Sequence, residues 1–465
     1  MPGGESIGAE TAARNAALLG VSEAELSLRA RRRIAWRLLP FLFLLYGIAF
    51  LDRMNIGAAA LQMPGDLGFD DRVVGLGAGI FFIGYVVLEI PGALLAELWS
   101  ARKWIARIMI SWGVLTIAMA FIRTKAEFYS VRFLVGAAEA GFFPAVLVYI
   151  SHWFQQRDRA VATASFVAAN PVSYIVGSPL AGLLLGITWF GLRGWRWLFI
   201  LEGIPAIVFG VAALFYLTDW PGQAKWLPCG ERDWLTGELH REKEAKRKAG
   251  AVSVWQALRR RDVLLLTLCY FFAMYGNYGL GFWLPTILKR ISGQNNLRVT
   301  LLAALPYVAG LAMQWLNSWH SDRTGERKQH SAVPLFVSAG MLALAAAFSS
   351  QLAPAMLFFI LAEAAYFAFQ PPFWAVPTMF LGESAAAASM GLINSLGNLG
   401  GFAGPFLVGA ISSSTHSFTG GLWSVAGGFI LSGLFMLGVG AGKGAEGAAR
   451  RFGGLGRARL GGKEE

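Results

Sequence analysis

Residues 318–328 read SWHSDRTGERK, and a shorter counterpart, ELWSARK, occupies residues 97–103. Each stretch follows an apolar run. In each, an acidic residue is followed five residues later by one basic residue and six residues later by a second. The acids are Glu97 and Asp322, and the cations are Arg102, Lys103, Arg327 and Lys328. The two acids are 225 residues apart, and Pro179 and Pro405 are separated by 226 residues. Two markers with nearly the same period indicate an internal duplication of the kind found in two-bundle transporters.

Apolar segments of the length needed to cross a membrane occur on both sides of this repeat. They are predicted near 38–60, 73–97, 104–122, 128–150, 161–188, 198–217, 262–288, 299–319, 332–350, 354–380, 386–412 and 421–441. The sequence therefore predicts an all-α integral membrane protein with 12 transmembrane helices in two six-helix bundles. The predicted parts are a tail (1–33), a bundle (34–217), a linker (218–261), a second bundle (262–441) and a tail (442–465).

Composition supports a membrane protein over a soluble one. Of the 465 residues 55% are hydrophobic and 15% are charged, whereas soluble domains contain about 25% charged residues. The mean hydropathy is +0.52. Cys229 and Cys269 form no CxxC pair and no cluster with histidine, so neither a disulfide framework nor a metal site is expected. We also find no nucleophile elbow and no phosphate loop, which argues against an enzyme.

Lysine and arginine are distributed unevenly among the loops. Both tails, the linker and the loops after the second, fourth and eighth spans contain 30 of the 40 basic residues. Positive charge is retained on the cytoplasmic side during insertion, so both termini are predicted to be cytoplasmic. Topology then explains the net charge of +12 without nucleic acid as a partner. We expect a multi-pass protein of the bacterial inner membrane.

The repeated loop has a plausible physical role at the cytoplasmic side. A carboxylate at a helix end can accept hydrogen bonds from the next helix's N-terminal amides and attract adjacent cations, which would latch two helices together. The alternative is that these cations only reflect the positive-inside rule. The predicted gate residues are Glu97, Arg102, Lys103, Asp322, Arg323, Gly325, Arg327 and Lys328.

Several ionisable residues lie within the predicted spans, where a charge costs about 2.5 to 3.5 kcal/mol. Asp52 and Arg53 follow Pro40 by about 18 Å of helix, near the expected midplane. Arg132 and Glu139 are seven residues apart and share a helix face. Between them lies Gly136, where a neighbouring helix or a ligand can approach closely. Glu89, Glu202 and Glu363 are further acids within spans, without an assigned role.

This combination of charges can couple an anion to a proton. Burial disfavours the charged form of a carboxyl group, whereas a neighbouring guanidinium favours it. An anion that binds the guanidinium weakens that support, so proton binding and anion binding favour each other. Arginine suits the anion because its planar group makes bidentate bonds. The alternative is a set of purely structural ion pairs.

The second loop resembles the signature G-x-x-x-D-R-x-G-x-R-K of the major facilitator superfamily. Ser318 replaces the first glycine, and the first copy is degraded at Glu97, Leu98 and Ser100. Three further stretches, 51–57 (LDRMNIG), 195–203 (WRWLFILEG) and 394–405 (NSLGNLGGFAGP), resemble the anion:cation symporter family. This family includes tartrate, galactonate, phthalate and hydroxyphenylacetate carriers, and the resemblance covers residues 31 to about 441.

The resemblance implies roles for particular residues. Asp52 and Glu139 would be the protonation sites, Arg132 would tune them, and Arg53 would contact a substrate carboxylate. The positions expected to hydrogen-bond substrate are Tyr85, Asn170 and Asn398. Additional cavity candidates are Trp374, Asn277 and Tyr278, the last two near a predicted helix break at Pro285.

The leading hypothesis is proton-coupled uptake of a small organic anion by alternating access. We expect the transporter to be a monomer that needs no cofactor or metal and uses protons as the coupling ion. A second hypothesis is proton-driven efflux of drugs or metabolites. It predicts a glycine-rich G-P-x-x-G-G pattern, which residues 177–182 (GSPLAG) match only in part. A transporter-like nutrient receptor is a third possibility, but the 44-residue linker is too small for an output domain.

Overall fold

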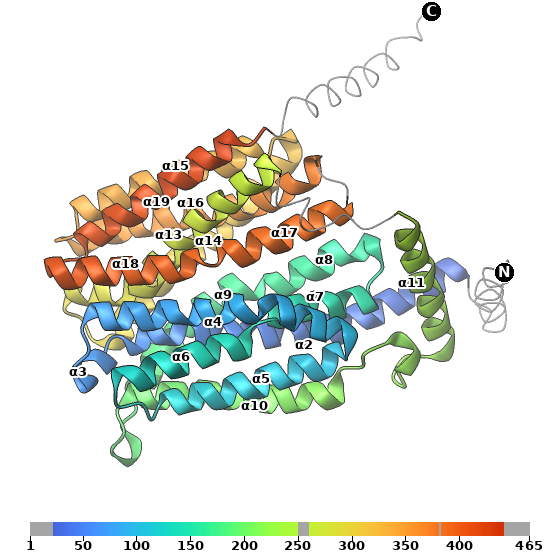
Figure 1. Cartoon of the computed structure of the whole chain (residues 1–465), viewed down its shortest axis with the longest axis horizontal. Helices are drawn as coiled ribbons and strands as arrows, with labels where there is room; N and C mark the ends of the chain where they lie inside the picture. The colour runs from blue at the N-terminus through green and yellow to red at the C-terminus, as the bar shows by residue number, and fades with distance from the viewer. Residues whose placement is uncertain (1–21, 250–259, 381–382, 441–465) are drawn as a thin grey trace, which may run out of the picture. The chain divides into compact units, whose positions relative to one another are not determined.

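A computed structural model describes residues 22–249, 260–380 and 383–440. These residues form helices and loops without strands, and they divide into two compact units (Figure 1). Unit 1 comprises Met1–Gly250 with Phe282–Ala304, and unit 2 comprises Ala251–Gly281 with Leu305–Glu465. The hairpin formed by the end of α13 (Arg261–Ser292) and the start of α14 (Asn296–Thr324) is thus grouped with unit 1.

Unit 1 contains the helices of the first half. They are α2 (Glu23–Ala59), α3 (Met63–Leu67), α4 (Asp71–Leu98), α5 (Ala101–Met119), α6 (Lys125–Glu139), α7 (Phe142–Trp153), α8 (Gln156–Val167), α9 (Ala169–Leu184), η1 (Trp189–Gly191), α10 (Gly194–Tyr216), η2 (Pro221–Gln223) and α11 (Cys229–Ala249). α2 begins inside the segment predicted as a polar tail, because Ser22 caps its first turn and accepts a hydrogen bond from the Glu25 amide.

The remaining helices belong to the second half. They are α13 (Arg261–Ser292), α14 (Asn296–Thr324), α15 (Lys328–Ala347), α16 (Leu352–Phe380), α17 (Glu383–Gly397), α18 (Gly400–Thr415) and α19 (Thr419–Gly438). α13 continues through Pro285, so the predicted helix break at that residue is wrong. In unit 2, α15 packs against both α16 and α19.

The predicted spans are present as helices. Over the described residues, ten helical spans are long and apolar enough to cross a membrane. The segments predicted near 104–122 and 386–412 are also helical, as α5 and as α17 with α18. The segment near 128–150 is divided into α6 and α7, because Gly141 adopts a left-handed conformation with φ of +82°.

Close packing of α4 on α6 depends on glycine. A Cβ atom at Gly136 would lie 1.9 Å from the backbone oxygen of Phe81, and one at Gly84 would lie 2.3 Å from the Phe133 oxygen. Only a hydrogen fits at these positions, so the two backbones touch. The predicted close approach at Gly136 is confirmed.

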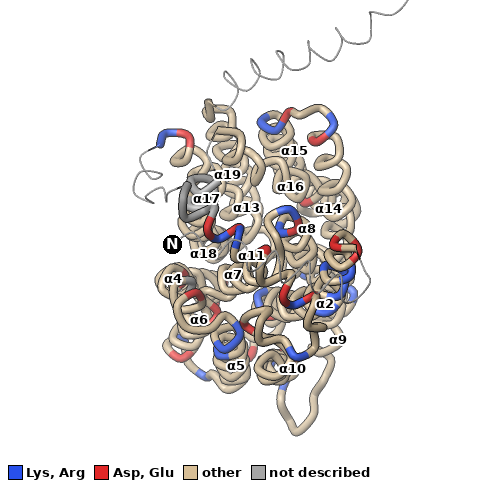
Figure 2. Tube along the Cα trace, turned by 90° about the vertical axis from the view of Figure 1, so that its right-hand side faces the viewer, with Lys and Arg blue, Asp and Glu red and all other residues tan. Residues whose placement is uncertain are grey.

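The predicted linker contains a helix, α11, which packs on the start of α2. Arg33 of α2 lies 3.2 Å from Glu231, and Arg159 of α8 lies 3.0 Å from Glu242. Figure 2 views the chain from this end and shows acidic and basic residues beside α2, α8 and α11. We call this the α11 end of unit 1. Burial raises the pKa of Glu231, and Arg33 lowers it in part.

Candidate substrate and proton site

An ion pair joins α2 to α6 inside unit 1. Arg53 donates to Glu139 Oε1 from Nε at 2.7 Å, and its Nη2 lies 2.6 Å from the same oxygen. The exposed fraction is 12% for the Arg53 side chain and 1% for the Glu139 side chain. Glu139 Oε2 has no hydrogen-bond partner among the described residues. The pair is therefore buried, with Arg53 the more accessible member and one carboxylate oxygen unused.

Asp52 and Arg132 lie beside this pair. Both are 4% exposed. Arg132 donates from Nε to the Gly77 oxygen at 3.2 Å, so a backbone carbonyl of α4 holds part of its guanidinium group. Asp52 interacts electrostatically with Glu139, Arg132 and Arg53. The structure thus brings together two acids and two guanidinium groups that are distant in sequence.

Aromatic rings surround the Arg53 guanidinium group. Its Cζ lies 5.2 Å from the ring centre of Phe50, 5.6 Å from Phe81 and 5.0 Å from Tyr85. The ring quadrupole attracts a cation placed over the ring face, which favours the charged guanidinium group at this position. Tyr85 was predicted from the family resemblance. Phe50 and Phe81 were not, although each is one helical turn from a predicted site residue.

Asp52 also has polar neighbours that sequence analysis missed. Thr116 of α5 lies next to the Asp52 carboxyl group, although its hydroxyl completes no hydrogen bond with any described residue. Asn55 lies one turn along α2 and is 1% exposed. Neither residue is ionisable, so neither stands out among the charges within the spans. The packing of α2 against α10 and the position of Thr116 beside Asp52 identify them.

The other predicted substrate residues are divided between the units. Asn170 is half-buried near the start of α9 in unit 1, and its Oδ1 has no hydrogen-bond partner in the described chain. Unit 2 contains Asn277, Tyr278, Trp374 and Asn398. Asn277, Tyr278 and Trp374 are half-buried, and Asn398 is 7% exposed. Trp374 packs edge-on against Tyr270, with the ring centres 5.0 Å apart.

The first copy of the repeated loop is held by a residue that we did not predict. Glu97 is exposed and bonds to no described residue. Asp219 instead accepts from the Arg102 amide at 3.0 Å and from the Ser100 hydroxyl at 2.7 Å. Arg102 is also 3.6 Å from Asp219, whereas exposed Lys103 lies 5.8 Å from the Trp99 ring centre. The expected latch at the start of α5 is therefore made by Asp219 rather than Glu97.

In the second copy, Glu326 performs the capping expected of Asp322. Glu326 accepts from the backbone amides of Gln329 at 2.7 Å and His330 at 3.1 Å. Although burial raises the pKa of Glu326, these hydrogen bonds outweigh it and hold the pKa below its usual range. Asp322 pairs with Arg327 at 2.6 Å.

The remaining residues of this loop have separate contacts. Gly325 has φ of +70°, which glycine adopts without strain. Lys328 donates to the Val439 oxygen at 2.7 Å, and Arg323 lies 5.4 Å from the Trp319 ring centre.

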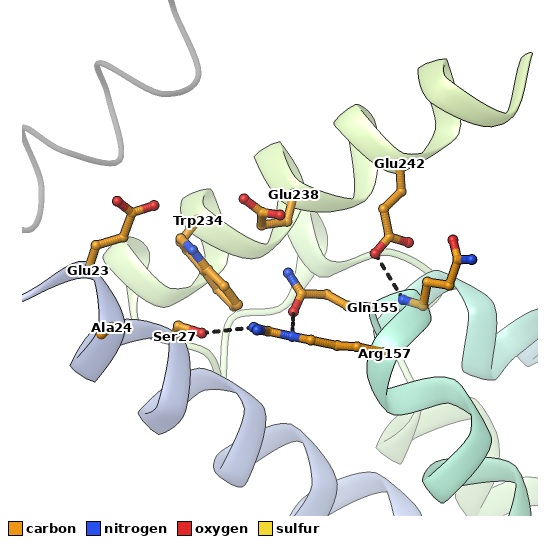
Figure 3. Close-up of a pocket in the computed structure, with 9 residues that line it drawn as sticks. Glu23, Ala24, Ser27, Gln155, Arg157, Trp234, Glu238 and Glu242 are labelled. Carbon is orange, nitrogen blue, oxygen red and sulfur yellow. Dashed lines mark hydrogen bonds between the residues drawn. The ribbon is translucent and has the colours of Figure 1, made fainter. Parts of the chain in front are cut away.

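A pocket of about 670 Å³ lies elsewhere, at the α11 end of unit 1 (Figure 3). It is lined by Glu23, Ala24, Ser27, Gln155, Gln156, Arg157, Trp234, Glu238 and Glu242. Arg157 extends across it and donates to Ser27 Oγ at 3.2 Å and to Gln155 Oε1 at 3.0 Å. None of the predicted substrate residues lines this pocket. Over the described residues, no group of three His, Cys, Asp or Glu side chains could hold a metal ion.

Ionisable residues paired inside long apolar helices are typical of membrane transporters. Residues 42–405 match the Major Facilitator Superfamily. The chain belongs to that superfamily, and it is a transporter rather than an enzyme.

Relatives and solved structures agree with this assignment. A protein of Agrobacterium vitis named "Putative tartrate transporter" is 45% identical, over 89% of this chain and 95% of its own. A quinolone resistance transporter of Acinetobacter baumannii is 38% identical, over 84% of this chain and 90% of its own length. The fold resembles a bacterial homologue of the human lysosomal transporter Spinster in its inward-facing, unoccupied form. That structure has a TM-score of 0.71 and 18% identity, over 89% of this chain and 96% of its own.

Proposed function

We propose that this protein imports a small organic anion, such as a hydroxy-dicarboxylate, together with protons across the bacterial inner membrane. The observation that carries the proposal is the buried Arg53–Glu139 ion pair beside Asp52. The relative named for tartrate supports a dicarboxylate substrate.

The mechanism follows from competition for Arg53. A substrate carboxylate can take the place of Glu139 at the Arg53 Nε and Nη2 atoms, because Glu139 uses only Oε1 there, whereas a substrate carboxylate can accept from the two nitrogens with both of its oxygens. Glu139 is then left buried without its direct ion-pair partner, and its charged form becomes less favourable. A proton that binds to Glu139 removes this penalty. Proton binding therefore favours anion binding and the reverse, as symport requires.

Asp52 and Arg132 extend this coupling. Asp52 interacts electrostatically with Glu139 and with the two guanidinium groups. Protonation of one acid therefore changes the free energy of ionising the other. Arg132 stays attached to the Gly77 oxygen and offers a permanent positive charge next to the acids. It offsets part of the negative charge when no substrate is bound.

Replacement of Asp52 by asparagine tests the coupling. We expect D52N proteoliposomes to lose tartrate accumulation driven by an inward proton gradient, because no proton can be carried at this position. Counterflow of labelled against unlabelled tartrate should remain, because exchange requires no net proton movement. Wild-type uptake that does not respond to the proton gradient would contradict the proposed symport.

The native cysteines test the proposed orientation, with both termini in the cytoplasm. Cys229 of α11 is exposed, whereas Cys269 is buried. A membrane-impermeant maleimide should therefore label inside-out vesicles at Cys229 and leave sealed right-side-out vesicles unlabelled. Cys229→Ser is the matched control and should abolish the signal. Labelling of right-side-out vesicles at Cys229 would reverse the topology.

Proton-driven efflux is the second candidate, and the quinolone resistance transporter is the observation that favours it. Norfloxacin distinguishes the two functions. An exporter would accumulate norfloxacin inside inside-out vesicles in exchange for protons, because their lumen corresponds to the periplasm. An anion importer would leave the distribution of norfloxacin unchanged and would accumulate tartrate in right-side-out vesicles.

A further inference from the structure

An apolar groove lies on the surface of unit 1, between the first half of α2 and α8. Its volume is about 420 Å³, and it is lined by Ala35, Trp36, Leu39, Pro40, Phe43 and Ser165. The first five residues belong to α2, and Ser165 belongs to α8, which packs against α2. The Ser165 hydroxyl donates within its own helix, to the Val161 oxygen at 2.8 Å. The groove therefore suits an apolar chain rather than a polar metabolite.

The groove crosses the predicted boundary between water and hydrocarbon. The membrane segment of α2 was predicted to begin near residue 38, and the groove extends from residue 35 to residue 43, about 12 Å along the helix. Trp36 at one end is 73% exposed, and tryptophan is enriched at the membrane–water interface. One end of the groove thus lies at the level of lipid head groups, and the other lies among acyl chains.

An unpaired arginine stands at the head-group end. Three of the four arginines between residues 29 and 33 have an acidic partner. The pairs are Arg29 with Glu25 at 2.5 Å, Arg31 with Asp158, and Arg33 with Glu231 at 3.2 Å. The fourth, Arg32, is exposed, and no acid or aromatic ring in the described part of the chain engages it. Arg32 is one turn before Trp36 on the same face of α2, so it adds an uncompensated positive charge beside the groove.

We propose that the groove binds an anionic phospholipid, with an acyl chain along Trp36, Leu39 and Phe43 and the phosphate on Arg32. The apolar lining matches the chain, and a guanidinium group binds phosphate with charge-assisted hydrogen bonds. A zwitterionic lipid offers the same chains without a net negative charge, so Arg32 selects the anionic lipid. This inference goes beyond the proposed function, because lipid binding requires neither substrate nor proton.

Quenching of Trp36 by brominated lipid tests the proposal. The full-length protein is reconstituted in phosphatidylcholine vesicles that contain a rising fraction of phosphatidylglycerol or phosphatidylcholine with brominated acyl chains. Bromine quenches tryptophan fluorescence at short range, and the Trp36 contribution is the difference between the wild type and Trp36→Phe. We expect phosphatidylglycerol to reach half-maximal quenching at an about fivefold lower fraction than phosphatidylcholine, as expected for one arginine near anionic lipid.

Variants at the head-group end separate Arg32 from general surface charge. Arg32→Gln should abolish the preference for phosphatidylglycerol, whereas Arg32→Lys should retain most of it, because an ammonium group still attracts phosphate. Arg72→Gln is the matched control. Arg72 is an exposed arginine at the start of α4 and does not line the groove, so its loss should leave the preference at Trp36 unchanged.

Filling the groove tests where the acyl chain lies. Ser165→Phe places a ring in the groove from the α8 side and should abolish the preference at Trp36. If this variant does not fold, Ala35→Leu fills the groove from the α2 side and should have the same effect.

Four results would overturn the proposal. The first is equal half-maximal fractions for the two lipids in the wild type. The second is a preference that survives Arg32→Gln. The third is a preference that survives filling of the groove, because the lipid would then be held by surface charge alone. The fourth is cross-linking of two chains at position 36 without quenching by either lipid, because a second copy would then cover the groove.

Discussion

Replacing Arg53 with glutamine is expected to reduce tartrate uptake by about 100-fold or more. Arg53 is the accessible cation of the buried pair, and a neutral amide cannot hold a carboxylate with two charge-assisted hydrogen bonds. The measurement is initial uptake into proteoliposomes at equal amounts of reconstituted protein. Arg29→Gln is the matched control, because Arg29 also pairs with a glutamate, Glu25, but both side chains are at least half exposed. It should retain wild-type uptake within about twofold.

A double variant separates binding from folding. Arg53→Gln leaves Glu139 buried without its cation, which destabilises the fold by about 3 to 5 kcal/mol. Arg53→Gln with Glu139→Gln removes both charges, so thermal stability should recover while uptake stays absent. Recovery of uptake in the double variant would show that the pair is purely structural, which was the alternative left open by the sequence.

Gly136→Ala is expected to destabilise the fold strongly. The added Cβ would lie 1.9 Å from the Phe81 backbone oxygen, and a backbone atom cannot rotate away as a side chain can. The added methyl group overpacks the interface, so α6 must move away from α4. We expect the free energy of unfolding to fall by about 3 kcal/mol or more. Glu139 lies one turn beyond Gly136, so transport should fall as well. Thermal unfolding in detergent measures the effect.

A second glycine provides the comparison. Gly427 of α19 lies in open space, with no atom within 4 Å of an added Cβ. Gly427→Ala should leave the midpoint of unfolding unchanged or slightly higher, because alanine favours helix. Equal stability of the two variants would contradict the close contact between α4 and α6.

The buried charges explain why the site could be predicted in large part. Asp52, Arg53, Arg132 and Glu139 are conspicuous because ionisable residues rarely occur in apolar spans. The seven-residue spacing of Arg132 and Glu139 places them on one helix face. The structure adds that Arg53, from a different helix, is the direct partner of Glu139. Their proposed roles in transport await the experiments above.

Other contacts could not be predicted because their partners are distant in sequence and chemically ordinary. Asp219 accepts a hydrogen bond from the Arg102 amide, 117 residues away in the sequence. Asp219 lies in a segment that was interpreted only as a linker. α11 was missed because its sequence is polar and contains no apolar run. Ion pairs connect it to α2 and α8, and Trp234 and Leu235 are its buried apolar residues.

By itself, the sequence determined that this chain has spanning helices, an internal duplication and a few charges inside the spans. These properties follow from local composition and spacing, since lipid tolerates only long apolar helices and penalises each buried charge. Tertiary structure alone decided which charges pair and which residue caps each repeated loop. Those outcomes depend on how helices pack, and contacts such as Gly136 against Phe81 determine the packing to within a fraction of an atom's diameter.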